Sequence, residues 1–120
     1  MADPIVYLEL PAPDLSRLEA FYAAVFGWKV ARSDLEAGVA YASFDAGSLQ
    51  GGLDPSLAVT PRGGPLLYVK VADLAGTLRA IEAAGGEVER PPHPVGGAHG
   101  YSARFKDPCG NHLGLWSSAP

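Results

Sequence analysis

Two matching stretches decide the fold: Ile5-Val-Tyr-Leu-Glu-Leu10 near the start of the chain and Leu66-Leu-Tyr-Val-Lys-Val71 in its second half. Each alternates apolar residues with Tyr, Glu or Lys, which is typical of a β-strand that packs one face and turns the other outward. The second stretch repeats the first at an offset of 61 residues, from position 5 to position 66. Such an internal repeat predicts a duplicated structural unit.

The same order of signals follows each stretch. Asp14 and Asp73 are candidate helix N-caps ahead of apolar residues at helical spacing, and glycines (Gly27, then the pair Gly85-Gly86) are candidate helix ends. Three short strands are then expected in each half, over residues 28–31, 39–45 and 49–53, and over 87–90, 101–106 and 112–117. A Pro/Gly-rich loop is expected over 91–100.

The predicted fold class is therefore α+β, with two tandem βαβββ modules. The modules span about residues 4–54 and 65–118, with a Pro/Gly-containing linker over about 55–64. A chain of 120 residues with 48% hydrophobic content suffices for one ordinary core. We expect a single domain over residues 1–120.

Charge and composition exclude several classes of protein. The net charge is -4 and the 9 Lys and Arg are scattered singly, so nucleic acid is not an expected partner. There is neither a signal-like start nor an apolar run long enough to cross a membrane, which indicates a cytoplasmic protein. The single cysteine, Cys109, forms no internal disulfide and lies in an expected turn.

Two phrases carry a resemblance to a known family: Phe21-Tyr22 leading into Val25-Phe-Gly-Trp28, and Asp107-Pro108 followed by Gly110-Asn111. On these, almost the whole chain resembles the vicinal-oxygen-chelate superfamily of glyoxalases, bleomycin-resistance proteins and extradiol dioxygenases. Within it, the chain looks like small bacterial proteins related to lactoylglutathione lyase. The resemblance implies a U-shaped eight-stranded half-barrel with helices outside, a ligand on the concave inside, and commonly a homodimer.

The resemblance also implies where a metal would bind. Metal-using members place His, Gln or Glu on the first and last strand of each module. With Gly47 taken as equivalent to Gly110, the matching positions are Tyr7, Gly51, Tyr68 and Gly114. Glycine offers no side-chain ligand, and divalent metals need several converging imidazole or carboxylate groups. We therefore expect no metal cofactor.

Strand alternation predicts which side chains line the concave face. Leu113 and Leu115 are expected to face the helices, which sends their neighbours to the opposite side. The expected ligand-binding set is Tyr7, Glu9, Tyr41, Ser43, Leu49, Gly51, Leu53, Tyr68, Lys70, Ser102, Arg104, His112, Gly114 and Trp116. Its aromatic walls and few polar groups favour flat or apolar organic molecules.

Three of these residues are weak catalytic candidates. Glu9 and Lys70 occupy equivalent positions of the repeat, where they form either a structural ion pair or a proton-transfer couple. His112 begins the last strand and is either a ligand-binding or proton-carrying group or a surface residue. His93 and His99 lie in the expected loop, where a structural or exposed role is favoured.

The preferred hypothesis is a metal-independent small-molecule-binding protein of the glyoxalase/bleomycin-resistance type, which holds a hydrophobic or aromatic ligand in the concave cavity. The alternative is a glyoxalase-like lyase or isomerase, or a dioxygenase, with a non-standard metal site or the Glu9/Lys70 couple. A third hypothesis is that a dimer surface is the functional part of the protein. Fold alone does not choose among them.

Overall fold

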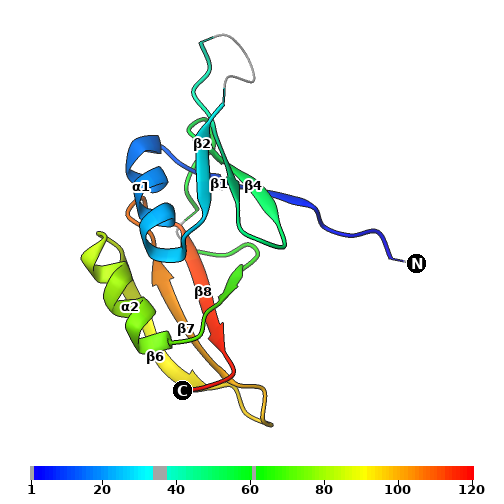
Figure 1. The fold of residues 1–120 in the computed structure, drawn as a ribbon, viewed down its shortest axis with the longest axis vertical. Helices are drawn as coiled ribbons and strands as arrows, with labels where there is room; N and C mark the ends of the chain where they lie inside the picture. Colours follow the sequence, from blue (N-terminus) through cyan, green and yellow to red (C-terminus); the bar gives the residue numbers. More distant parts are fainter. Residues whose placement is uncertain (1, 34–37, 61) are drawn as a thin grey trace. The chain divides into compact units, whose positions relative to one another are not determined.

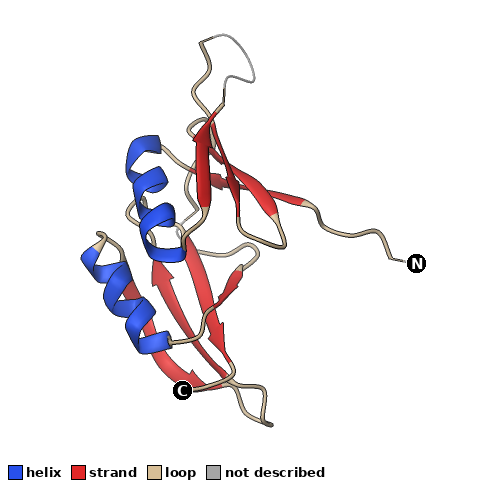
Figure 2. Ribbon diagram, in the orientation of Figure 1, coloured by secondary structure: helices blue, strands red, loops and turns tan. Residues whose placement is uncertain are grey.

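The computed structural model describes residues 2–33, 38–60 and 62–120. The chain divides into two compact units, Met1–Val59 and Thr60–Pro120. Each unit contains one helix and one four-stranded sheet in the order βαβββ, as predicted (Figures 1 and 2). The division falls inside the segment 55–64.

The first unit contains β1 (Tyr7–Pro11), α1 (Leu15–Phe26), β2 (Lys29–Arg32), β3 (Ala42–Asp45) and β4 (Gln50–Asp54). Its sheet, called sheet A here, has the strand order β1-β4-β3-β2, with β1 parallel to β4 and the other pairs antiparallel. The strand expected over 39–45 begins only at Ala42. Residues 34–37 lie outside the described part of the chain.

The second unit contains β5 (Tyr68–Lys70), α2 (Leu74–Ala83), β6 (Glu87–Pro94), β7 (Tyr101–Lys106) and β8 (His112–Ser117). Its sheet, sheet B, repeats the topology with the order β5-β8-β7-β6. The expected loop over 91–100 is wrong in its first part, because β6 continues to Pro94. Proline is tolerated there because β6 is an edge strand and its pairing with β7 is interrupted by register shifts.

Both helices begin where the sequence predicts and α1 ends at the predicted Gly27, whereas α2 ends at Ala83 with Ala84 as its C-cap, just before the predicted pair Gly85-Gly86. The carboxylates of Asp14 and Asp73 accept hydrogen bonds from the backbone N–H of Arg17 and Gly76, which satisfies one of the free donors at each helix start. Gly27 ends α1 in the left-handed conformation at φ 68°, and its N–H bonds the carbonyl of Ala23. No helix in the described ranges is long and apolar enough to cross a membrane.

An aromatic stack joins α1 to sheet A. The rings of Tyr22 and Trp28 stack with centroids 4.7 Å apart, and Trp28 stacks on Phe44 at 4.6 Å. Phe21 and Tyr22 are buried, so these aromatic residues serve the core. Phe44 and Phe105 occupy matched buried positions in the two units.

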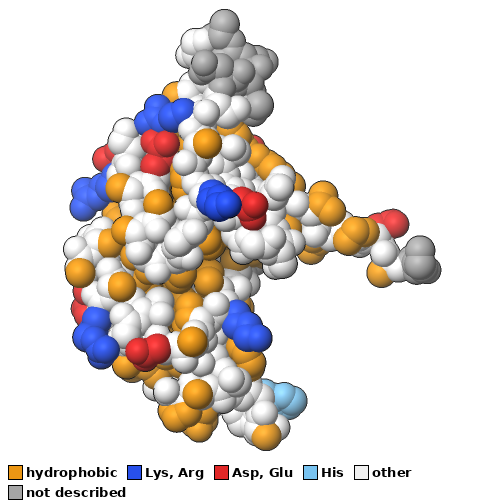
Figure 3. All heavy atoms as spheres, viewed as in Figure 1, with side chains coloured by type: hydrophobic (Ala, Val, Ile, Leu, Met, Phe, Trp, Pro, Cys, Tyr) orange, Lys and Arg blue, Asp and Glu red, His pale blue; other side chains and the backbone are white. Residues whose placement is uncertain are grey.

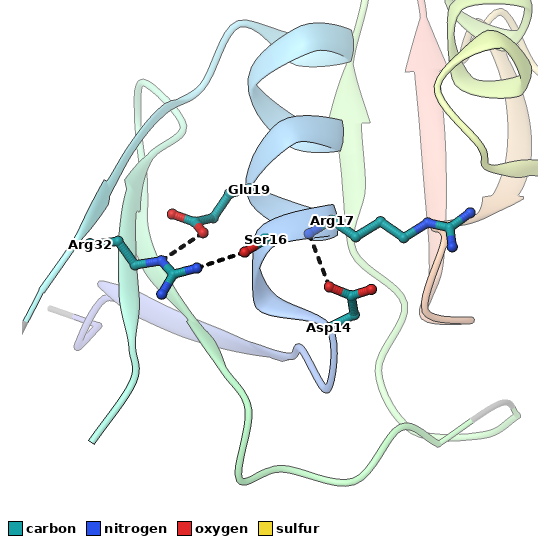
Figure 4. Close-up of polar contacts among 5 residues, drawn as sticks. All are labelled: Asp14, Ser16, Arg17, Glu19 and Arg32. Atoms are coloured by element: carbon teal, nitrogen blue, oxygen red, sulfur yellow. Dashed lines mark hydrogen bonds and ion pairs between the residues drawn. The ribbon is translucent and has the colours of Figure 1, made fainter. Parts of the chain in front are cut away.

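Hydrogen bonds from Arg32 also join β2 to α1. The guanidinium of Arg32 donates through Nε to Glu19 at 2.7 Å and through Nη2 to Ser16 at 2.9 Å (Figure 4). Both partners lie on α1. Arg32 thus points to the helix-covered face of sheet A, which leaves the opposite face for other roles.

The Asp107–Asn111 phrase is a tight turn between β7 and β8. Asp107 accepts from the backbone N–H of Cys109 and Asn111 and from the Asn111 side-chain amide. Gly110 adopts φ 95°, which side-chain-bearing residues rarely reach. The most recognisable phrase of the sequence therefore shapes a connection between strands.

Candidate functional site

Each sheet has one face against its helix and one open face. In sheet A, β1, β4 and β3 align Leu10 with Leu53 and Ala42 in one row, and all three are buried. The adjacent row, Glu9 with Gly52 and Ser43, therefore lies on the opposite, open face. Tyr7 shares that face because it lies two residues before Glu9 on the same strand. The sequence predicted this placement of Tyr7, Glu9 and Ser43.

Tyr41 crosses the open face of sheet A. Its hydroxyl and ring lie where a β-carbon on Gly52 would be placed, so the ring reaches β1 only because Gly52 has no side chain. The Tyr41 hydroxyl donates to Oε2 of Glu9 at 2.8 Å and lies 2.7 Å from the hydroxyl of Tyr7. Three predicted site residues are thereby brought into one hydrogen-bonded cluster, called the tyrosine–glutamate cluster here.

Burial sets the protonation state of Tyr41. The side chain is 5% exposed. Desolvation, followed by the hydrogen bonds to Tyr7 and Glu9, raises the pKa of Tyr41 well above its usual range. Tyr41 therefore keeps its proton into the alkaline range, where an exposed tyrosine ionises, and acts as a hydrogen-bond donor.

The prediction is wrong for two residues of β4, which lie on the helix-covered face instead of the open face. Gly51 pairs with Leu8 and Phe44 on the helix-covered side, and Leu53 lies in the buried row. The equivalence of Gly47 with Gly110 caused the error, because residues 46–49 connect β3 to β4 whereas residues 107–111 connect β7 to β8. The two connections differ by one residue, and a slip of one residue moves every side chain to the other face. Leu49 belongs to this turn.

The open-face residues of β4 that sequence reasoning missed are Gln50 and Gly52. Gln50 pairs with Tyr7 across β1 and β4, just as Gly114 pairs with Tyr68 across β5 and β8. Strand pairing thus replaces the expected position Gly51 by Gln50. The sequence signal that could have given this position is the length of the β3–β4 turn, which is one residue shorter than the β7–β8 turn.

In sheet B the expected lining residues do share the open face. Leu113 and Leu115 are buried toward α2, as predicted, and α2 contacts β8. The neighbouring positions pair in rows on the other side, Tyr68 with Gly114 and Arg104, and Lys70 with Trp116 and Ser102. His112 pairs with Lys106 at the end of the same face.

An aromatic ring covers Gly114. A β-carbon at Gly114 would meet Cε2 and Cδ2 of the Tyr68 ring at 2.5 and 2.6 Å. Tyr68 is 51% exposed, so one side of its ring rests on the strand and the other faces outward. The space above Gly114 is thus filled by an aromatic ring.

Trp116 is held in a fixed orientation on the same face of sheet B. Its indole Nε1–H donates to the carbonyl of His99 at 2.7 Å, and the close packing of Gly100 supports the indole edge. The ammonium group of Lys70 lies 5.9 Å from the centroid of the Trp116 ring, within the range of a cation–π contact. Tyr68 and Trp116 form the aromatic part of the open face.

His112 forms a pair that the sequence did not predict. Its Nδ1 lies 2.7 Å from Oε1 of Glu89, whose Oε2 is 3.9 Å from Nζ of Lys106. A carboxylate has no hydrogen to give, so Nδ1–H donates and the neutral ring carries its lone pair on Nε2. That Nε2 is buried and has no hydrogen-bond partner within the described residues. Because Nε2 is buried, a substrate can reach it only if the side chains that cover it move aside.

The other two histidines serve different contacts. His93 lies on β6 and its Nε2 is 3.4 Å from the Ser102 hydroxyl, at the long limit for a hydrogen bond. His99 provides a backbone carbonyl to Trp116. Among the residues that the structure describes, neither belongs to a group of metal-binding side chains.

The metal that the family resemblance implies does not fit the residues present. No three His, Cys, Asp or Glu side chains converge within the described ranges 2–33, 38–60 and 62–120. The positions marked by strand pairing hold Tyr7, Gln50, Tyr68 and Gly114, and the Tyr68 ring occupies the space next to Gly114. A divalent ion needs several converging nitrogen, carboxylate or thiolate donors.

Comparison with known proteins agrees with this architecture. Residues 4–115 match the model of the Glyoxalase/Bleomycin resistance protein/Dioxygenase superfamily, and the chain belongs to that superfamily. A glyoxylase-like domain-containing protein of Didymella fabae is 28% identical over 86 residues, a match that covers 67% of this chain and 66% of that protein.

Solved structures share the fold at lower identity. The fosfomycin resistance protein FosX of Listeria monocytogenes superposes with a TM-score of 0.80 at 19% identity, covering 97% of this chain and 91% of that one. A mutant of the same protein, described as complexed with Mn(II) and 1S,2S-dihydroxypropylphosphonic acid, gives a TM-score of 0.77 at 18% identity, with 98% and 93% covered. These likenesses establish the fold.

Proposed function

We propose that this chain is a metal-independent small-molecule-binding protein that holds a hydrophobic or aromatic ligand on the open face of a sheet. The observation that carries the proposal is the Tyr68 ring above Gly114, where family members that use a metal place a ligand. An aromatic ring in place of a metal ligand offers stacking area instead of coordination. Trp116, fixed by its bond to His99, offers a second aromatic surface on the same face at little entropic cost.

The first test measures metal content. The purified, untagged protein is analysed by elemental mass spectrometry, before and after incubation with Ni, Zn, Mn and Fe(II) and desalting. We expect far less than one metal ion per chain. Near-stoichiometric retained metal would overturn the proposal.

The second test measures ligand binding. A thermal-shift screen of aromatic and aliphatic compounds is followed by fluorescence titration of each hit, because Trp28 and Trp116 are the only tryptophans. We expect quenching by aromatic hits that disappears in Trp116→Phe, while the stacked Trp28 still emits. Quenching that persists unchanged in that variant would place the ligand elsewhere.

A second candidate function is catalysis by proton transfer, which the Glu89–His112 pair favours. A histidine whose Nδ1–H bonds a carboxylate can accept a proton at Nε2 once the side chains that bury this atom move aside, and this chemistry suits a lyase or isomerase acting on an activated carbon acid. The Glu9/Lys70 couple stays a prediction, because the two residues belong to separate units.

Hydrogen–deuterium exchange tests this candidate without knowledge of the substrate. NMR follows loss of the α-protons of 1-phenyl-2-propanone in D2O with and without the protein. Catalysis predicts exchange that is lost in His112→Gln, reduced in Glu89→Gln and unchanged in His99→Gln. No acceleration by the unaltered protein would leave binding as the function.

We further propose a cytoplasmic homodimer. Ile5 and Val6, 84% and 68% exposed, lie on the extended segment before β1, where Figure 3 shows a run of hydrophobic side chains. Exposed apolar residues next to the edge strand β1 are suited to contact with a second copy. Sedimentation velocity should show a dimer that Ile5→Ser/Val6→Ser weakens, and cell fractionation checks the compartment.

A further inference from the structure

The direction of every hydrogen bond in the tyrosine–glutamate cluster follows from its chemistry. The Tyr41 hydroxyl carries one hydrogen and donates it to Oε2 of Glu9. Its 2.7 Å contact with Tyr7 must therefore be donated by Tyr7. The raised pKa of Tyr41 keeps that hydrogen in place. The chain of donors runs from Tyr7 through Tyr41 to Glu9.

This direction leaves the outward side of the cluster with acceptors only. The hydrogen of the Tyr7 hydroxyl is used, so its oxygen presents lone pairs, and Tyr7 is 45% exposed. Glu9 is exposed and has one oxygen outside the bond to Tyr41. None of the ion pairs found among the described residues involves Glu9. A ligand arriving here meets a carboxylate and a phenol oxygen that can only accept.

We propose that the tyrosine–glutamate cluster on sheet A recognises a cationic group, such as a primary ammonium, on a small aromatic or hydrophobic ligand. The inference rests on the proposed binding function and names a class of ligand for the open face of sheet A taken by itself. An ammonium supplies three donors and a positive charge, whereas a ligand carboxylate would meet lone pairs and a like charge. The exposed Tyr7 ring adds an electron-rich surface for a cation.

The neighbours of the cluster on the open face carry no charge. Gly52 and Ser43 complete the row of Glu9, and Gln50, whose amide both donates and accepts, pairs with Tyr7. The lysine on that face, Lys29, lies in the row of Asp45 on the far edge strand β2 and is directly opposite that carboxylate. Glu9 therefore supplies the charge that a ligand meets at the cluster.

Three probes with the same ring test the proposal on the unaltered protein: 2-phenylethylamine, 2-phenylethanol and 3-phenylpropionate. Binding is measured by calorimetry and by NMR shifts of the Tyr7 and Glu9 backbone amides. We expect the amine to bind about tenfold more tightly than the alcohol, the effect of one charge-assisted hydrogen bond. The carboxylate should bind most weakly.

Three variants test which residue causes the preference for the amine. Glu9→Gln removes the charge at nearly constant shape and should lower the affinity for the amine about tenfold while leaving the alcohol unchanged. Asp45→Asn is the control, since it removes the same charge from the same face away from the cluster. Tyr41→Phe frees the Tyr7 hydrogen and should raise the affinity for the carboxylate probe.

The outcomes separate the two proposals. If the carboxylate or alcohol binds as tightly as the amine, or if Glu9→Gln changes nothing, the cationic preference is overturned while aromatic binding stands. If none of the three probes binds and the wider compound screen also finds no ligand, the binding function falls and the preference falls with it. Circular dichroism checks each variant's fold, and the probe series on the unaltered protein decides should a variant misfold.

Discussion

The hydroxyl of Tyr41 occupies the place where a side chain on Gly52 would begin. Gly52 does not need glycine for its backbone, since its φ is not among the positive values of the chain. It needs glycine because a buried ring passes over it. Residue size at position 52 therefore controls whether Tyr41 can reach Glu9.

Replacing Gly52 by Ala should destabilise the protein and break the tyrosine–glutamate cluster. Overpacking against a buried ring costs about 1–3 kcal/mol, which urea unfolding can measure. In a Tyr41→Ala background the same substitution should cost almost nothing, because the ring is gone. Equal costs in the two backgrounds would show that Tyr41 does not lie over Gly52 in solution.

Stability should fall in alkali because of Tyr41. The folded state raises the pKa of Tyr41, so above the ordinary tyrosine value of about 10 the folded chain holds a proton that the unfolded chain has lost. Unfolding then releases a proton, and its free energy decreases as pH rises. Below that value the contribution is fully present.

Urea unfolding between about pH 9 and 11 measures this decline. Tyr41→Phe should flatten it, whereas Tyr101→Phe should leave the slope as it is. An identical slope in the protein and in Tyr41→Phe would mean that Tyr41 ionises normally.

Replacing Gly114 by Ala should cost less than the change at Gly52, below about 1 kcal/mol, although a ring covers both glycines. Tyr68 is half exposed and can swing outward, whereas Tyr41 is buried. The displaced Tyr68 ring should nevertheless alter aromatic binding on sheet B. Thermal unfolding and the fluorescence titration check both statements, and a loss as large as that of Gly52→Ala would contradict the first.

Arg32→Lys should weaken the attachment of β2 to α1 by about 0.5–1 kcal/mol. Lysine keeps the charge but cannot bond Glu19 and Ser16 through a planar fork (Figure 4). The contacts are partly exposed, which keeps the loss small. Arg17→Lys is the matched control on the same helix, and equal effects of the two changes would argue against a specific role for Arg32.

Sequence reasoning located the repeat, the helix ends and the open face of sheet B because these depend on local patterns. Asp14, Asp73 and Gly27 act within one helical turn of where they stand. The alternation around Leu113 and Leu115 is uninterrupted along β8, so its outward residues could be read directly.

The remaining features depend on turn lengths and register shifts, which residue alternation does not reveal. Gly51 and Leu53 were assigned to the wrong face because the β3–β4 turn is one residue shorter than its counterpart. Glu89 escaped notice because the pairing of β6 shifts register between Val88 and Arg90, which ends simple alternation there. Tyr41 precedes β3 and reaches β1 across an intervening strand, a distance that no spacing rule covers.

The two adjacent glycines of β4 each lie under a ring, Phe44 on the helix side of Gly51 and Tyr41 on the open side of Gly52. Over these two residues only the peptide backbone separates the core from the open face. A shift of the backbone on the helix side therefore displaces the ring on the other side. Substitutions that enlarge the core around Phe44 should disturb the hydrogen bond between Tyr41 and Glu9 on the opposite face of the sheet.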